Sequence, residues 1–308
     1  MTRYRITLIF LRKPFSYWYP GTDIVNEIVN AFGKHVDNGD VIVISEKAIS
    51  TATGNIYDEN SILLDPLSTL LTKLCNTMWA KLFSYIFRSP QTIYLLNNMP
   101  INAIAAHKKL ALKIGGLKHF FKPLSEAGID ASNLPYKYVS LPLKKANDIA
   151  IKISSDIYKE IGKRVCILII DTDRCYKPRW LRGMVFSTRR SEIRGVIDFG
   201  AIGYFIGKRF RKLFKEYPTP VACSCTNVEL PLILFISKKV EKYMGSGLGR
   251  NAMEMMRRLG KNSFDDITWA DMNIVKHYPA ILVKIMFCDA NGACFKIDPC
   301  QLYKQASQ

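Results

Sequence analysis

The chain has 308 residues, of which 48% are hydrophobic and 23% charged, with 18 Gly and 14 Pro. This composition excludes intrinsic disorder and collagen-like structure, and the length corresponds to about two domains or one large one. No apolar stretch approaches the roughly 18 residues of a membrane span, and the N-terminal stretch is too short for a secretory signal. We therefore expect a cytoplasmic protein without a membrane partner.

The first 45 residues predict a strand, a helix and a second strand. Residues 3–11 are rich in β-branched side chains, which is typical of a strand. After a turn at Pro20-Gly21, apolar residues recur at helical spacing over 24–32. A turn at 38–40 then leads into an apolar strand at 41–45.

Later segments alternate between helical and extended patterns. In the helix predicted at 66–87, Trp79 and Phe83 are expected to be core residues rather than part of a ligand site. The remaining predicted elements are helices at 66–87, 146–161 and 228–244, an amphipathic run at 251–259, a strand at 165–170, and a closing hairpin of 281–287 and 293–297 around a turn at 290–292.

The cysteines do not form a metal-binding pattern. Eight are spread over the chain, with no Cys-x-x-Cys pair, and the four histidines lack the His-x3-His spacing of zinc sites. We expect reduced thiols, most of them small core residues.

Basic residues are concentrated in one segment of this chain, whose formal net charge is +18. Between Arg174 and Lys215 there are twelve Lys and Arg residues against Glu192 and Asp198, a net charge of +10. Such a concentration predicts a surface for an anionic partner, either nucleic acid, a nucleotide or a phosphorylated small molecule, or else a solvated face. For a small phosphate-bearing ligand, the cations expected to face the cleft are Arg174, Lys177 and Arg179.

Two acidic loops are candidates for chemistry. Asp171 follows the apolar strand at 165–170 and precedes Thr172. A carboxylate and a hydroxyl at a strand end can bind Mg²⁺ or Mn²⁺, although an Asp turn that caps a loop fits as well. Asp130 and Asn133 lie in the small-residue loop AGIDASN, which permits close approach of a ligand.

A glycine-rich loop follows the predicted helix at 228–244. Gly245, Gly247 and Gly249 could leave backbone N–H groups for phosphate oxygens. The loop lacks the Lys-Ser/Thr of a Walker A loop and follows a helix rather than a strand, so a helix C-cap loop is the alternative interpretation.

Three segments together resemble a known family. GDVIVISEKAISTATG (39–54), AGIDASN (127–133) and RVCILIIDTDR (164–174), in this order, resemble the coenzyme F-420 γ-glutamyl ligases, which add L-glutamate to coenzyme F-420-0 with GTP. The resemblance runs with gaps from about Pro20 to Met244. It implies a mixed α/β (α+β) fold, a single module over 1–308 with two intimately connected and discontinuous lobes, and a homodimer. Residues 247–278 are then an insertion relative to the family.

The resemblance also implies roles for individual residues. Asp130 and Asp171 would bind one divalent metal, Thr172 a second, and Asn133 the GTP. The resemblance also implies contacts to the nucleotide from Lys47, Ser50, Gly245 and Gly247. The implied reaction activates the terminal carboxylate of the coenzyme as an acyl phosphate, which the glutamate amine then attacks, with Mg²⁺ or Mn²⁺ required and K⁺ a further candidate ion.

Departures from the family pattern favour a second hypothesis. Thr51 stands where the family usually has Lys, and Ser246 where it has Glu or Gln, so the second metal site is weakened. A basic protein that keeps the ligase fold but binds nucleic acid through residues 174–215 is therefore the alternative. The retained Asp130, Asp171 and Thr172 favour the ligase.

Overall fold

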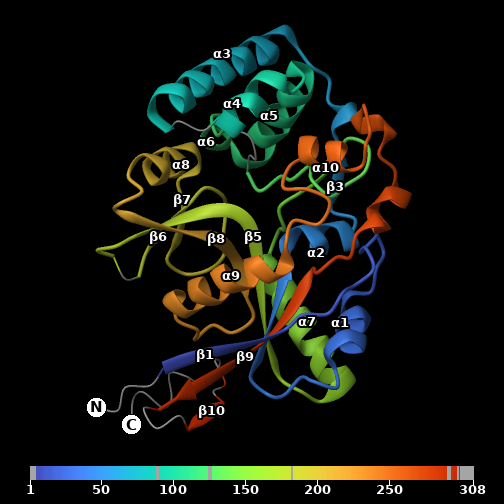
Figure 1. Cartoon of the computed structure of the whole chain (residues 1–308), viewed down its shortest axis with the longest axis vertical. Coiled ribbons are helices and arrows are strands. Elements are labelled where there is room, and N and C mark those ends of the chain that lie inside the picture. Colours follow the sequence, from blue (N-terminus) through green and yellow to red (C-terminus); the bar gives the residue numbers. More distant parts are fainter. Residues whose placement is uncertain are drawn as a thin grey trace.

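A mixed β-sheet forms the centre of the molecule, with helices on both of its faces (Figure 1). This computed structural model describes residues 5–87, 90–123, 127–181, 183–289, 293–296 and 298. The strand order is β1-β9-β2-β5-β6-β7, with β10 paired to β9 and β8 paired to β5. The strands are β1 (Arg5–Leu11), β2 (Asp40–Ser45), β5 (Val165–Pro178), β6 (Val185–Ser187), β7 (Val196–Asp198), β8 (Phe214–Cys223), β9 (Ala280–Cys288) and β10 (Cys294–Lys296).

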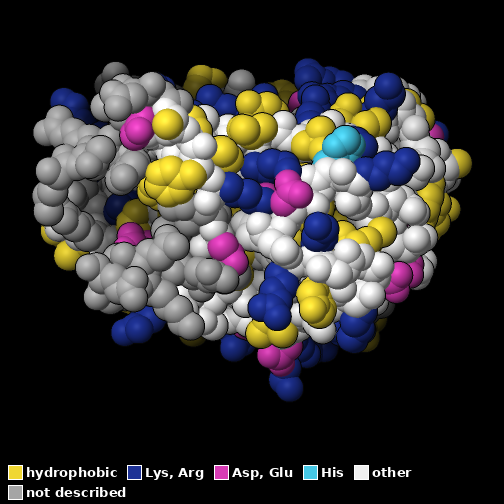
Figure 2. All heavy atoms as spheres, turned by 90° about the horizontal axis from the view of Figure 1, so that it is seen from below, with side chains coloured by type: hydrophobic (Ala, Val, Ile, Leu, Met, Phe, Trp, Pro, Cys, Tyr) yellow, Lys and Arg dark blue, Asp and Glu magenta, His cyan; other side chains and the backbone are white. Residues whose placement is uncertain are grey.

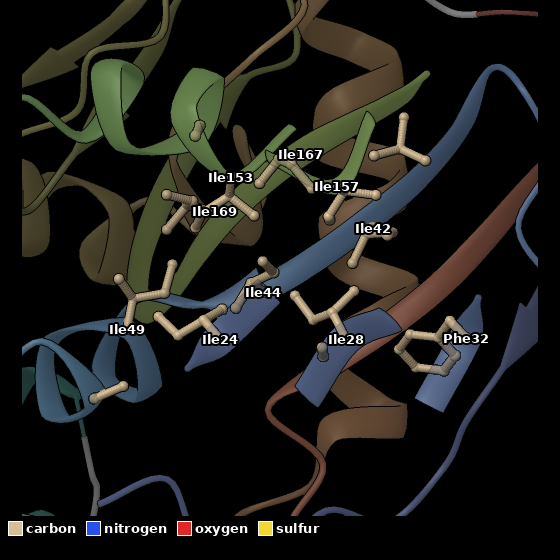
Figure 3. Close-up of a cluster of buried hydrophobic side chains, with 14 of the residues drawn as sticks. Ile24, Ile28, Phe32, Ile42, Ile44, Ile49, Ile153, Ile157, Ile167 and Ile169 are labelled. Carbon is tan, nitrogen blue, oxygen red and sulfur yellow. The ribbon is translucent and has the colours of Figure 1, made fainter. Parts of the chain in front are cut away.

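Alternation along β2 builds a core on each face of this sheet. Ile42 and Ile44 point to one face and Val41 and Val43 to the other, as the period of two requires. The first face is covered by α1 (Ile24–Phe32), α2 (Glu46–Ala52) and α7 (Ala146–Ile161), whose isoleucines interdigitate with those of the strands (Figure 3). The second face is covered by α9 (Leu230–Met244). We call this sheet with its covering helices the α/β body. It confirms the predicted mixed α/β class.

A helical lobe formed by residues 66–122 lies at the end of the molecule opposite the chain termini (Figure 1). It contains α3 (Pro66–Leu82), a π-helical turn (Phe83–Phe87), α4 (Pro90–Asn98), α5 (Ile101–Gly115) and α6 (Leu117–Phe120). Trp79 and Phe83 are buried in it, as predicted, and their cluster packs against α8 (Gly200–Arg209). Among the described residues no helix is both long and apolar enough to cross a bilayer.

Two smaller units join the lobe to the body. A two-stranded sheet pairs β3 (Ile56–Asp58) with β4 (Tyr138–Ser140). Residues 245–275 contribute α10 (Ala252–Arg258) and two short 3-10 helices, Phe264–Asp266 and Trp269–Ile274. These pack around Tyr17, whose hydroxyl donates to the Asn133 carbonyl. The assignment of 247–278 as an insertion stays a prediction.

The strand that carries Asp171 is longer than predicted. We expected it to end at residues 171–173, but β5 continues to Pro178. Its partner β8 pairs with both halves, and the register shifts between Asp171 and Arg174, which marks a β-bulge. The polar run is thus an irregularity inside a strand, because pairing with β8 outweighs the local turn signal.

The closing hairpin is confirmed, but the expectation of reduced thiols is wrong there. β9 and β10 pair antiparallel, and their register sets Cys288 opposite Cys294. The two residues form a disulfide with Cα atoms 4.0 Å apart. Their six-residue spacing gave no local signal, because only the hairpin register makes them neighbours. The predicted turn 290–292 and Ile297 lie outside the described residues.

Candidate active site

A cavity of about 660 Å³ lies between the helical lobe, the β3–β4 sheet and the segment around α10. Asp130 and Thr172, which the sequence singles out, are both among its lining residues. Ser132 lines it as well, so residues of the AGIDASN loop and of β5 meet at one cavity. Apolar side chains such as Ile104 and Phe264 alternate with polar ones in the wall, a composition typical of small-molecule sites.

The AGIDASN loop fixes the Asp130 carboxylate. The backbone of Asp130 pairs with that of Ser140, and the Ser132 N–H donates to Asp130 Oδ1 at 2.7 Å. Lys47 Nζ lies 2.5 Å from Asp130 Oδ2 and also donates to the Ser132 hydroxyl at 2.7 Å. Lys47, at the start of α2, therefore neutralises Asp130.

A buried ion-pair network lies beside this loop. The Arg189 guanidinium donates to Asp171 Oδ2 at 2.6 Å and to Glu46 Oε1 at 2.8 Å, and its Nη1 also contacts Glu46 Oε2. Only 1% of the Arg189 side chain is exposed. Burial opposes its charge, but Glu46 and Asp171 outweigh this and raise the pKa of Arg189. Burial raises the pKa of the Glu46 carboxyl, and Arg189 opposes that shift.

A glycine makes room for this guanidinium. Gly128 has φ +80°, and a Cβ at this position would lie 2.5 Å from the Arg189 guanidinium carbon. The glycine of AGIDASN thus serves close packing against Arg189 as well as the left-handed backbone.

Successive residues of β5 point to different surroundings. Thr172 is exposed to the cavity, whereas Asp171 and Asp173 are buried. Asp173 accepts from the buried Lys122 of the helical lobe at 2.7 Å. The strand therefore offers a hydroxyl to the cavity and binds both neighbouring carboxylates to cations.

The residues implied in nucleotide contacts have structural partners. Asn133 donates to the carbonyls of Ser246 and Gly249 and accepts from the Leu248 N–H, so its side chain holds the glycine-rich loop. Ser50 is buried and donates to a backbone carbonyl of residue 141. Neither Asn133 nor Ser50 lines the cavity.

Gly245 and Gly247 of the glycine-rich loop also have structural roles. Gly245 caps α9 with φ +72°, as the C-cap interpretation requires. Gly247 lies against the Asn133 side chain, and its carbonyl accepts from Arg258. Neither glycine lines the cavity. Their contact with nucleotide stays a prediction, but the structure does bring this loop against AGIDASN.

The cations that follow Asp171 do not line the cavity. Arg174 forms ion pairs with Glu241 at 2.6 Å and with Glu216 at 3.4 Å. Lys177 and Arg179 lie farther along β5 and its extension and are likewise not lining residues. The structure therefore does not place these three cations at this cavity, since β5 continues past Asp171, and their contact with a phosphate stays a prediction.

Two other cations line the cavity instead. Lys137 pairs with Asp265 at 3.0 Å. Arg250 precedes α10, and in the described part of the chain no carboxylate forms an ion pair with it. Sequence reasoning missed both, since neither lies in a basic run. It also missed Glu46, whose only signal is its position directly after the strand at 41–45.

The donor chemistry of the cavity suits a hard cation. No group of three or more His, Cys, Asp or Glu positioned for a metal occurs among the described residues. Asp130 and Thr172 nevertheless present a carboxylate and a hydroxyl to one space, and such oxygens are the ligands that Mg²⁺ and Mn²⁺ prefer. For Asp130 to bind a cation, Lys47 would have to release its carboxylate. The Asp171 carboxylate is held by Arg189.

Comparison with known proteins places these residues in a family. The family described as F420-0:Gamma-glutamyl ligase matches residues 15–198, which include Asp130, Asp171 and Thr172. An uncharacterized protein of Methanocaldococcus jannaschii, MJ1361, is 28% identical over 85% of this chain and 90% of its own length. The coenzyme F420:L-glutamate ligase of the same organism is 27% identical over 44% of this chain and 49% of its own length. The chain that forms this cavity therefore belongs to the F420-0:gamma-glutamyl ligase family.

Proposed function

We propose that this protein is a GTP- and divalent-metal-dependent ligase that joins L-glutamate to a carboxylate of coenzyme F420-0 or a related acceptor. The observation that carries the proposal is the convergence of Asp130 and Thr172, from distant segments of the matched region, on one cavity. At about 660 Å³, the cavity lies in the usual range for small-molecule sites of about 300–1,000 Å³.

The chemistry would proceed in two steps. An oxygen of the acceptor carboxylate attacks the γ-phosphorus of GTP, forming a mixed anhydride and releasing GDP. The glutamate nitrogen then attacks the carbonyl carbon, the amide bond forms, phosphate leaves and the amine loses a proton to solvent or phosphate. This balance needs no oxidant or reductant.

The chain's own residues supply binding and charge. Arg250 lines the cavity, and among the described residues its guanidinium forms no ion pair, although its backbone N–H donates to the Glu254 carboxylate, so it is our candidate to bind a phosphate. Lys47 holds Asp130, and Thr172 offers a hydroxyl to the same cavity. Arg189 positions the segment behind the site by clamping Glu46 and Asp171.

Asp130 and Thr172 are the residues that would hold a divalent metal in this cavity. When bound there, Mg²⁺ or Mn²⁺ would neutralise phosphate charge during phosphoryl transfer. Lys47 would then be released from Asp130 and become available to the substrate.

The test is product formation. We expect that protein incubated with GTP, Mn²⁺, L-glutamate and F420-0 yields a glutamylated product by mass spectrometry. Asp130→Asn and Thr172→Val should lose product and lose the thermal stabilisation by GTP with Mn²⁺. Asp156→Asn, on α7, should retain both, because Asp156 does not line the cavity. Absence of product and of nucleotide-dependent stabilisation in the unmodified protein would contradict the proposal.

The nucleic-acid alternative has weaker support. Of the twelve cations between Arg174 and Lys215, Arg189 is buried, and Arg174 and Lys208 form ion pairs with Glu216. Arg182 lies outside the described residues. Oligonucleotide affinity at two salt concentrations tests this alternative, since six to ten phosphate contacts predict a loss of roughly 10³–10⁵ between 50 and 200 mM salt.

A further inference from the structure

The outer face of α3 carries an apolar stripe. Its members recur at spacings of three, one, three and four residues, so they project from one side of the helix. They are Leu67, Leu70, Leu71, Leu74 and Met78, and between 42% and 64% of each is exposed. The opposite side of α3 buries Cys75 and Trp79 in the lobe. The stripe is thus extra apolar surface that the fold itself does not use.

The charged side chains of the lobe itself are all basic. Residues 66–122 contain eight Lys and Arg and no Asp or Glu. Lys108 and Lys122 are buried, and Lys109 and Lys118 pair with carboxylates outside this range, Asp65 and Asp198. Three exposed lysines of the described lobe have no carboxylate partner there, namely Lys73, Lys81 and Lys113. Arg88 lies outside the described residues.

A crevice of about 480 Å³, lined by both polar and apolar side chains, adjoins the stripe on the same helix. Lys73, Thr77 and Lys81 line it, and their four-residue spacing forms a row along the flank of α3. Asn76 and Asn97 add amide groups. The crevice therefore places two cations and several hydrogen-bonding groups next to exposed leucines.

We propose that α3 docks the protein onto an anionic membrane surface, contrary to the expectation from the sequence of no membrane partner. A helix with an apolar stripe and lysines beside it lies in the plane of a bilayer interface, with the leucines among the acyl chains and the lysines at phosphate headgroups. At 17 residues α3 is about 25 Å long, and it lies along the outer edge of the lobe, where a flat surface can reach it (Figure 1).

Charge distinguishes a membrane from the other occupants of such a stripe. A second copy of the chain would bring the same unpaired lysines to the contact, and like charges facing each other are unfavourable. The leucines of the stripe lie on exposed helix surface, and the crevice beside them carries Lys73 and Lys81, so an acidic helix of another protein has no wholly apolar groove to enter. A bilayer rich in anionic lipid offers acyl chains to the leucines and phosphate groups to the lysines.

The experiment is flotation of the full-length protein with vesicles. We expect binding to vesicles of equal parts phosphatidylglycerol and phosphatidylcholine, little binding to phosphatidylcholine alone, and weaker binding as salt rises. Leu70→Ser combined with Leu74→Ser should reduce partitioning roughly tenfold or more. Lys73→Glu combined with Lys81→Glu should reduce it on anionic vesicles by a similar factor.

Matched controls come from α7. Ile151→Ser and Lys152→Glu change an exposed isoleucine and an exposed lysine on the helix that covers the sheet, and they should leave binding unchanged. Thermal unfolding checks that every variant is folded. Absence of vesicle binding, equal binding by the α3 and α7 variants, or a dimer by light scattering that the Leu70/Leu74 variant abolishes would each overturn the proposal.

Discussion

In the α/β body, buried charges lie against opposite charges, whereas the exposed lysines of α3 have no such partners among the described residues. Arg189 is clamped between Glu46 and Asp171, and on the face opposite α3 Lys and Arg side chains are scattered over the surface, some of them beside Asp or Glu (Figure 2). Apolar residues differ in the same way: Ile42 is fully buried, and 59% of Leu74 is exposed. The comparison teaches that the buried charges and apolar side chains of the body are satisfied within the chain, whereas the stripe of α3 and the lysines beside it stay exposed without a partner among the described residues.

The largest effect is expected from breaking the buried ion pairs of Arg189 in the body. Arg189→Met leaves Glu46 and Asp171 without their cation in a buried site, and this should lower the free energy of unfolding by about 3–5 kcal/mol. Arg190→Met, at the exposed neighbouring position, should change it little. Urea unfolding measures both, and equal losses would show that the network contributes nothing specific.

A smaller effect is expected from filling the space beside Arg189. Gly128→Ala combines a left-handed φ of +80° with a Cβ 2.5 Å from the guanidinium carbon. Gly54→Ala has a similar φ of +70° but meets nothing within 4 Å. Gly128→Ala should therefore cost about 1–3 kcal/mol more than Gly54→Ala in chemical unfolding. If the two costs are the same, the close packing is not important.

The junction between lobe and body should respond to pH. Asp198 of β7 pairs with Lys118 and His119 of α6. Burial works against its ionisation, but hydrogen bonds from His119 and Lys118 outweigh this and lower the pKa of Asp198 to about 2. A lowered carboxyl pKa stabilises the fold above the unfolded pKa, and the contribution is lost as pH falls from about 4 to about 2.

We expect Asp198→Asn to cost about 2 kcal/mol at pH 7 and progressively less as the pH approaches 2. Urea titrations at several pH values measure this convergence. Asp156→Asn, whose exposed partner Lys159 lies on the same helix, serves as the control and should change stability little at any pH. A cost for Asp198→Asn that is independent of pH would contradict the ionic origin of the contact.

The smallest effect on the free energy of unfolding is expected for an exposed leucine of the stripe, in contrast to a leucine buried in the sheet. Leu74→Ala on the stripe should change the free energy of unfolding by no more than about 0.5 kcal/mol. Leu168→Ala, in a strand where 1% of the side chain is exposed, should cost about 2–5 kcal/mol. A large cost for Leu74→Ala in denaturant unfolding would mean that the stripe supports the fold.

Strong periodicity made much of the α/β body predictable. The helices at 24–32 and 146–161 and the strand at 41–45 match α1, α7 and β2 closely, because each buries one apolar face or run. The helix predicted from 228 begins two residues later as α9, with Pro231 in its first turn, where a missing N–H costs nothing. The segment 214–223 gave no clear signal, yet it forms β8 through pairing with β5.

The candidate site was predictable only in part. Asp130 and Thr172 follow apolar runs and do reach one cavity. Arg189 stands in a basic run where nothing local distinguishes it from Arg190, and its role depends on Glu46 and Gly128, which are distant in sequence. Arg250 reaches the cavity through the packing of α10 against Tyr17. Such long-range contacts have no local pattern.

The place of β9 in the sheet has a consequence for synthesis. Within the described residues, the strand partner of β1 is β9, with Arg5 opposite Cys288 and Leu11 opposite Leu282. The N-terminal strand therefore emerges first and pairs last, after a wait of roughly 15–55 s at translation rates of about 5–20 residues per second. Throughout that interval Phe10 and its neighbours belong to an unpaired strand, which is open to non-native pairing. Completion of the sheet consequently waits until β9 has been synthesised, and β1 stays a potential partner for non-native strands until then.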